Sequence, residues 1–254
     1  MMAREATTDR IRSFDGVQLA VHRTGGGMPV LLLHGLFSNA QTNWIKFGHA
    51  AKLAEAGYEV FMPDLRAHGA SDAPHDPAAY PSDVLAKDVA AIVAHYGWEG
   101  FDLAGFSLGA RTAARCVTNG MRPRRLALLG MGLEGLAGWD KRAAFFIDAI
   151  DRFDEVGRGD RAFMAVSFMK TMKVDRIAAR LLLQSVADAE PEQLRATLTM
   201  PTLVLCGEDD HDNGSPDKLA ELLPDARLRL IPGTHMSSVT KPDMGTELAA
   251  FFAA

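Results

Sequence analysis

Short apolar runs recur along the chain, each with the length and composition of a buried strand. The first, Val30–Leu33, contains only apolar residues and is too short for a helix. Runs of the same kind are Glu59–Met62, Phe101–Ala104, Leu126–Leu129, Thr202–Cys206 and Leu228–Ile231. Segments with helical periodicity separate most of them, at Trp44–Ala56, Ser82–Tyr96, Leu108–Asn119, Pro216–Leu223 and Asp243–Phe252. This alternation predicts an α/β fold with a doubly wound, mostly parallel sheet.

The first part of the chain shows a different pattern. Two short runs of alternating polar and apolar residues flank Asp15 and Gly16, a dipeptide that suits a tight hairpin turn. They predict an antiparallel pair at one edge of the sheet. Together with the buried runs, this gives a sheet of about eight strands.

One connection is much longer than the others. Roughly seventy residues separate the run ending at Leu129 from the run starting at Thr202, far beyond an ordinary loop. Their helical periodicity predicts a helical cap, 133–198, inserted after the sixth strand into a core formed by 1–132 and 199–254. Its apolar side chains suit either packing or a substrate channel; they are Phe145, Phe146, Phe163, Met164, Phe168, Met169 and Met172.

Composition narrows the possible partners. The 254 residues carry a net charge of −5 with scattered basic residues, which argues against a nucleic-acid partner. Cys116 and Cys206 lie far apart in apolar segments, as expected of free thiols. The N-terminal segment has no apolar leader, and no run is long enough to span a membrane. We therefore expect a cytoplasmic protein without membrane association, of an oligomeric state that the sequence does not indicate.

The segment Gly105-Phe106-Ser107-Leu108-Gly109 places one serine between a buried run and a helical segment. It matches the pattern G-x-S-x-G. That position is the carboxyl end of a strand, where open α/β sheets build their sites. Small flanking residues permit a sharp turn, and the following helix offers main-chain N–H groups to a developing negative charge. Ser107 is therefore a candidate nucleophile.

A serine hydroxyl needs a base to remove its proton and a third group to orient that base. His235 follows the last predicted strand, at the same sheet edge as Ser107. Asp210 follows the strand before it and is the first candidate for the orienting carboxylate, with Asp209 and Asp212 as alternatives. The acidic segment also suits a metal ion, but no matching set of ligands occurs elsewhere at a recognised spacing, so we predict no metal site.

In this order and context, the motifs resemble those of the α/β-hydrolase family. The segments are "HGLFSN", "DLRAHGASD", "GFSLG", "GEDD" and "GTH", and the likeness spans 30–252. The resemblance implies that Ser107 is the nucleophile, that His235 is the general base and then the acid, and that Asp210 holds the imidazole. The serine-nucleophile branch, including small bacterial carboxylesterases, is the nearest match.

The resemblance also implies supporting roles. An oxyanion hole would use the main-chain N–H groups of Leu36 and Leu108. Asp64, Arg66 and His68 would fix a loop by hydrogen bonding.

Two features leave room for variation. Ala67 stands where the family usually has glycine, which is a small change. Glu134 follows the sixth strand, where some relatives place the acid of the triad, and is a further candidate beside Asp210.

Ser107 favours acyl transfer, because family members that open epoxides or displace halide carry aspartate at this position. We expect a carboxylic ester hydrolase that acts on a small-molecule ester through an acyl-enzyme. Relatives with the same triad cleave carbon–carbon bonds, lactones or thioesters, or make peracids, and these reactions stay open. A non-catalytic ligand-binding protein on the same scaffold is also possible. Phosphate-binding glycine motifs are absent where strands meet helices, so no cofactor is predicted.

Overall fold

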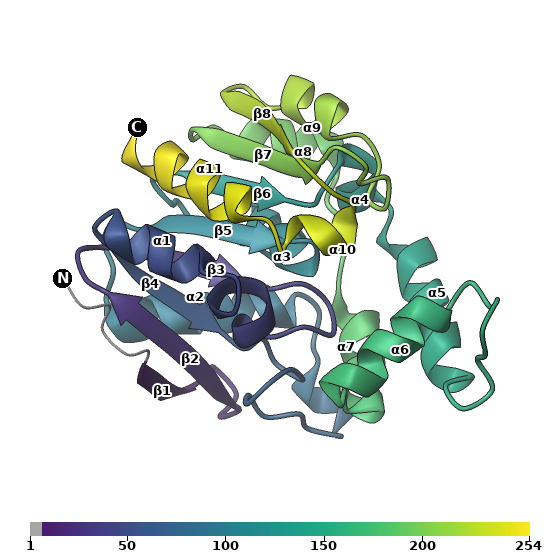
Figure 1. Ribbon diagram of the computed structural model, residues 1–254. Helices are drawn as coiled ribbons and strands as arrows, with labels where there is room; N and C mark the ends of the chain where they lie inside the picture. The colour runs from purple at the N-terminus through teal and green to yellow at the C-terminus, as the bar shows by residue number, and fades with distance from the viewer. Residues whose placement is uncertain (1–6) are drawn as a thin grey trace.

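The computed structural model describes residues 7–254 and contains an eight-stranded sheet (Figure 1). The strands are β1 (Thr7–Arg12), β2 (Gln18–Gly25), β3 (Met28–Leu33), β4 (Tyr58–Pro63), β5 (Asp102–Phe106), β6 (Leu126–Leu129), β7 (Thr202–Gly207) and β8 (Ala226–Ile231). Their order across the sheet is β1-β2-β4-β3-β5-β6-β7-β8. β2 is antiparallel to β1 and β4, and the other neighbours are parallel. The predicted mostly parallel sheet is confirmed.

Helices cover both faces of the sheet, which explains why its central strands are continuously apolar. Those outside the long insertion are η1 (Gln41–Ile45, a π-helical turn), α1 (His49–Glu55), η2 (Pro77–Ala79, a 3₁₀ turn), α2 (Val84–Tyr96), α3 (Leu108–Thr118), α9 (Pro216–Leu222), α10 (His235–Ser238) and α11 (Pro242–Ala253). Val30 and Leu32 of β3 pack in one core cluster with α1 and α11. Leu31 and Leu33 pack in the other with α2 and α3. Successive side chains of β3 therefore enter opposite cores.

Two sequence-based expectations about these elements are wrong. The helix expected over 44–56 is divided into η1 and α1, because Gly48 between them adopts the left-handed conformation with φ of 80°. The apolar run over 228–231 predicts a strand buried on both faces, but Leu230 of β8 is 50% exposed. β8 is the last strand of the sheet, so only one of its edges is paired and its outer surface faces solvent.

The insertion between β6 and β7 is helical, as expected. It contains α4 (Leu133–Ala137), α5 (Trp139–Asp151), α6 (Phe163–Met172), α7 (Arg176–Ser185) and α8 (Pro191–Thr197). In Figure 1, α5, α6 and α7 lie together to one side of the sheet. α5 contacts both α6 and α7, whereas α8 packs against α3 and α4 against α9. We propose that 133–198 form the cap, joined to the core through α4 and α8.

The apolar side chains of the insertion differ in their surroundings. Phe145 and Phe146 are partly buried and pack against the larger core cluster. Met169 is fully buried, whereas Met164 is 73% exposed. Packing therefore accounts for most of these residues. No helix within 7–254 is both long enough and apolar enough to cross a membrane.

Candidate active site

Ser107 occupies a strained turn between β5 and α3. Its φ and ψ are 54° and −111°, a conformation that residues with a Cβ rarely adopt. Its main chain is held in place on both sides, since its N–H donates to Leu129 O at 2.9 Å and its O accepts from Arg111 N–H at 3.0 Å. The side chain is partly exposed at the carboxyl end of the sheet. The turn therefore presents the hydroxyl to the site.

The two glycines of the motif allow α3 to approach the sheet closely. A Cβ at Gly105 would collide with the main chain of Gly109. A Cβ at Gly109 would in turn collide with the main chain of Leu33 in β3. The space between helix and sheet admits no side chain at either position, so both glycines are required for this turn.

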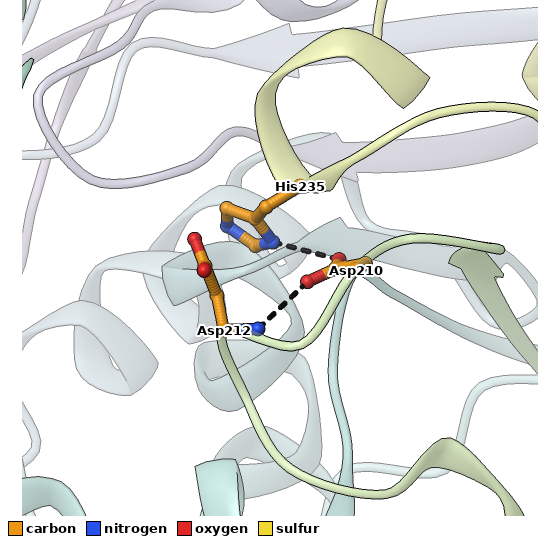
Figure 2. A group of neighbouring side chains, drawn as sticks. All are labelled: Asp210, Asp212 and His235. Atoms are coloured by element: carbon orange, nitrogen blue, oxygen red, sulfur yellow. Dashed lines mark hydrogen bonds and ion pairs between the residues drawn. The ribbon is translucent and has the colours of Figure 1, made fainter.

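Ser107, His235 and Asp210 form one chain of hydrogen bonds. His235 Nε2 lies 3.0 Å from Ser107 Oγ. His235 Nδ1 lies 2.8 Å from Asp210 Oδ2, and Figure 2 shows this second contact. The ionised carboxylate only accepts, so Nδ1 carries the proton and Nε2 is left to accept from the serine hydroxyl. These three residues come from the loops after β5, β7 and β8 and meet at one edge of the sheet.

The imidazole is held by packing as well as by hydrogen bonds. His235 begins α10, where Thr234 and Ser237 form a capping box. Its ring stacks on Phe106, with centroids 4.9 Å apart. A side chain at Gly130 would meet both rings, since an added Cβ would lie 3.1 Å from His235 Cε1. His235 is only 8% exposed, and its position is therefore closely defined.

Asp209 and Glu134, two further candidates for the orienting acid, occupy different surroundings. Asp209 is exposed, and its N–H donates to Gly233 O at 3.1 Å. Glu134 accepts from Ser215 N–H at 2.8 Å and from Lys218 Nζ at 2.7 Å. The bond from Lys218 is the main reason why the pKa of Glu134 falls to about 2. Within 7–254, Asp210 is the acid whose carboxylate is hydrogen-bonded to His235.

Asp212, the third candidate, lies beside the imidazole of His235. Its N–H donates to Asp210 Oδ1 at 3.1 Å, and its carboxylate points toward the ring in Figure 2. The ligand-type atoms of Asp210, Asp212 and His235 all lie within 4.8 Å of one another. Both ring nitrogens already have partners in Ser107 and Asp210, so a metal ion would have to displace one of them. The expectation that there is no metal site stays a prediction.

The loop after β3 lies close to the turn that carries Ser107. A Cβ added at Gly35 would lie 3.6 Å from Ser107 Cβ, so this loop passes beside the nucleophile. The N–H of Leu36 forms no hydrogen bond within 7–254. Leu108 begins α3, where an N–H has no partner within the helix. Both N–H groups are thus available to an oxygen atom.

Neighbouring N–H groups of this loop are occupied by side chains. Gly35 N–H donates to Asn43 Oδ1 at 3.1 Å, and Phe37 N–H donates to His68 Nε2 at 3.0 Å. Ala40 N–H donates to Asp64 Oδ1 at 2.8 Å. The loop is therefore tied down on both sides of Leu36. Asn43 is not among the residues that the motifs identify, and it lies one residue before the helix expected over 44–56.

The segment containing Asp64, Arg66 and His68 serves the loop-fixing role predicted for it. Arg66 is fully buried and pairs with Asp88 at 2.6 Å and with Asp15 at 2.5 Å. His68 Nδ1 donates to Arg66 O at 2.9 Å, which leaves Nε2 free to accept from the loop. Burial lowers the pKa of His68 to about 3, so the ring stays neutral in this role.

Ala67 lies in the same segment, where the family usually has glycine. Its effect on the backbone is larger than the small size of alanine implies. Its φ is 66°, in the left-handed region where glycine avoids the steric cost of a Cβ. The substitution for the usual glycine therefore introduces backbone strain beside the site.

Known proteins share this fold. A family model described as the alpha/beta hydrolase fold matches residues 28–126. A thermophilic esterase from Thermogutta terrifontis superposes with a TM-score of 0.77 at 22% identity, over 97% of both chains. The chain has the α/β-hydrolase fold.

Two curated proteins that the chain resembles are named for different reactions. Epoxide hydrolase 2 of Siraitia grosvenorii is 31% identical over 102 residues, which are 40% of this chain and 31% of that protein. N-formylmaleamate deformylase of Pseudomonas putida is 29% identical over 159 residues, 60% of this chain and 58% of that protein. The chain thus matches between about a third and just over half of the length of these relatives.

Replacing His68 should test whether the loop beside Ser107 depends on its anchors. His68→Leu removes the acceptor for Phe37 N–H and should displace the adjoining N–H of Leu36, the expected oxyanion donor. We expect kcat to fall by about 10- to 100-fold with KM nearly unchanged, because such a donor acts mainly on the transition state. His68→Gln offers an oxygen near the same position and should restore most of that loss. Steady-state kinetics with one ester measures this. A fall in stability without a fall in kcat would separate the loop from catalysis.

Proposed function

We propose that this α/β-hydrolase is a serine hydrolase that cleaves carboxylic esters through an acyl-enzyme. The observation that carries the proposal is the hydrogen-bonded chain Ser107–His235–Asp210 at a strained strand–helix turn. A nucleophile within hydrogen-bond reach of a base, and a base oriented by a carboxylate, is the arrangement that such chemistry requires.

The first half-reaction follows from the positions of the donors and acceptors. Ser107 Oγ attacks the ester carbonyl carbon while its proton passes to His235 Nε2. The carbonyl oxygen becomes an oxyanion, which accepts hydrogen bonds from the N–H groups of Leu36 and Leu108. Asp210 stabilises the imidazolium that forms. The imidazolium then gives its proton to the departing alkoxide, and an alcohol and an acyl-serine result.

The second half-reaction reverses these roles. His235, neutral again, takes a proton from a water molecule as its oxygen attacks the acyl carbon. The second tetrahedral intermediate uses the same oxyanion donors, and Ser107 leaves with the proton from His235. The products are a carboxylic acid and free enzyme, so every proton transfer is assigned to a group of the chain.

The relatives support hydrolysis of a small molecule and leave open which bond is cleaved. One structural neighbour is an esterase, and one curated relative is an N-formylmaleamate deformylase. Epoxide opening is disfavoured, because the family members that do so carry aspartate where this chain has Ser107. Carbon–carbon, lactone and thioester hydrolysis and peracid formation use the same triad and stay open within the proposal.

Labelling with a fluorophosphonate probe tests the proposal directly. Wild-type protein should gain one phosphonyl group on Ser107, identified by mass spectrometry of the peptide that contains it. Ser107→Ala should not react, and only wild-type protein should turn over p-nitrophenyl esters of graded acyl length. Label on another residue, or equal turnover by both proteins, would contradict the proposal and favour a non-catalytic binding protein.

A further inference from the structure

Arg142 of α5 reaches from the cap to the loop that carries the proposed triad acid. Its Nη1 donates to the main-chain oxygen of Asp212 at 2.5 Å. Asp212 and His235 in turn present ligand-type atoms within 4.8 Å of each other. The guanidinium therefore lies next to this loop, the acid loop, whose Asp212 side chain is close to the proposed catalytic base.

One turn along α5, Phe146 contacts the opposite side of the site. Its ring meets that of Phe37 edge-on, with centroids 5.5 Å apart. Phe37 follows Leu36 in the loop after β3, which we call the oxyanion loop. Arg142 Cζ lies 5.8 Å from the centroid of Phe146. One face of α5 thus bridges the acid loop and the oxyanion loop, between which Ser107 lies.

The charge of Arg142 is only partly compensated. Burial lowers the pKa of this arginine, and the charges of Asp212 and Asp210 act on it through space. Arg115, also part-buried, contacts the carboxylate of Asp83 through two nitrogens at 2.7 Å and 2.8 Å. Arg142 forms no such ion pair within 7–254, and its hydrogen bond to Asp212 goes to a carbonyl oxygen.

A guanidinium has five N–H donors in a planar fork that fits a carboxylate. Arg142 is half-buried and has no ion pair within 7–254, so its charge is partly desolvated, and an anion that binds there offsets that cost. The side-chain N–H groups of Arg142 that form no hydrogen bond within 7–254 are not fully buried. These donors are therefore accessible to solvent and to a ligand.

We propose that Arg142 binds a carboxylate group of the substrate, so that the preferred substrates are monoesters of dicarboxylic acids. The inference rests on the proposed ester hydrolysis and adds the substrate class. In this arrangement the carboxylate binds to Arg142 while the ester carbonyl lies at Ser107. Tethering of the acid loop through Asp212 is the competing role for Arg142, and it requires no anionic group on the substrate.

Two p-nitrophenyl esters of equal chain length separate these roles. One is the p-nitrophenyl monoester of glutaric acid, which carries a free carboxylate, and the other is p-nitrophenyl valerate. Wild-type protein should have the higher kcat/KM for the glutarate ester. Arg142→Gln should lower the ratio of the two kcat/KM values by about 10- to 100-fold, mainly through KM of the charged ester. Lys141→Gln, the same charge change on the same helix, should leave the ratio unchanged.

Several results would overturn the inference. They are a wild-type ratio near one, an equal loss on both esters in Arg142→Gln, or an equal effect of Lys141→Gln. A separate measurement keeps the inference testable if neither ester is hydrolysed and the proposed function fails. Glutarate should raise the Tm of Ser107→Ala protein, and the shift should disappear when Arg142→Gln is added. An unchanged shift would show that Arg142 does not hold the carboxylate.

Discussion

Replacing Ser107 with alanine should lower kcat by about 10⁵- to 10⁶-fold while KM changes little, as expected when the nucleophile of a hydrogen-bonded triad is lost. The side chain of alanine fills the same turn, and the partners of Ser107 in the main chain do not depend on the hydroxyl. Initial rates with a p-nitrophenyl ester, at protein concentrations high enough to detect residual turnover, measure the effect. Activity within tenfold of wild type would remove Ser107 from the mechanism.

Ser107→Gly is the matched control, because it removes the hydroxyl and also the Cβ. The turn holds φ at 54°, which glycine adopts without steric cost. We therefore expect Ser107→Gly to be as inactive as Ser107→Ala but more stable by about 1 kcal/mol. Urea denaturation of both variants measures the difference. Equal stability of the two variants would show that the turn at Ser107 is not strained. It would not affect the conclusion about activity.

The sequence is informative where a single local requirement fixes the residue type. The apolar run at β3 predicts a strand buried on both faces, and its side chains do alternate between two cores. Gly105 and Gly109 predict close packing around Ser107, and a Cβ at either would collide with main-chain atoms. These features depend on neighbours a few residues away or on one adjoining strand.

Features that depend on distant partners could not be predicted in the same way. Asn43 has no motif of its own, and its role is visible only where its amide accepts from Gly35. Arg142 lies 70 residues from its hydrogen-bond partner Asp212, in an insertion whose helices have no family motif to align. The orientation of the cap relative to the sheet decides the contact of Arg142. Local periodicity contains no information about that orientation.

Asp210→Asn should lower kcat by about 10⁴-fold, because an asparagine at this position can turn its amide toward Nδ1 and favour the wrong tautomer of His235. With Nδ1 unprotonated, Nε2 carries the proton and can no longer accept one from Ser107. The overall geometry should be kept, since asparagine retains an oxygen that can accept from Asp212 N–H. Kinetics of the variant beside wild type, with circular dichroism as a check on folding, tests this.

The three remaining candidate acids provide the comparison that decides the assignment. Asp209→Asn, Asp212→Asn and Glu134→Gln should each keep kcat within about threefold of wild type, because none of these carboxylates is hydrogen-bonded to His235 within 7–254. Asp212→Asn is the most demanding control, since its carboxylate lies beside the imidazole and its loss changes the local charge by the same amount as Asp210→Asn. If the loss followed charge alone, both variants would fall together. A large loss confined to Asp210→Asn would instead show that the hydrogen bond to Nδ1 sets the rate, and a large loss confined to Asp212→Asn would move the orienting role to that residue.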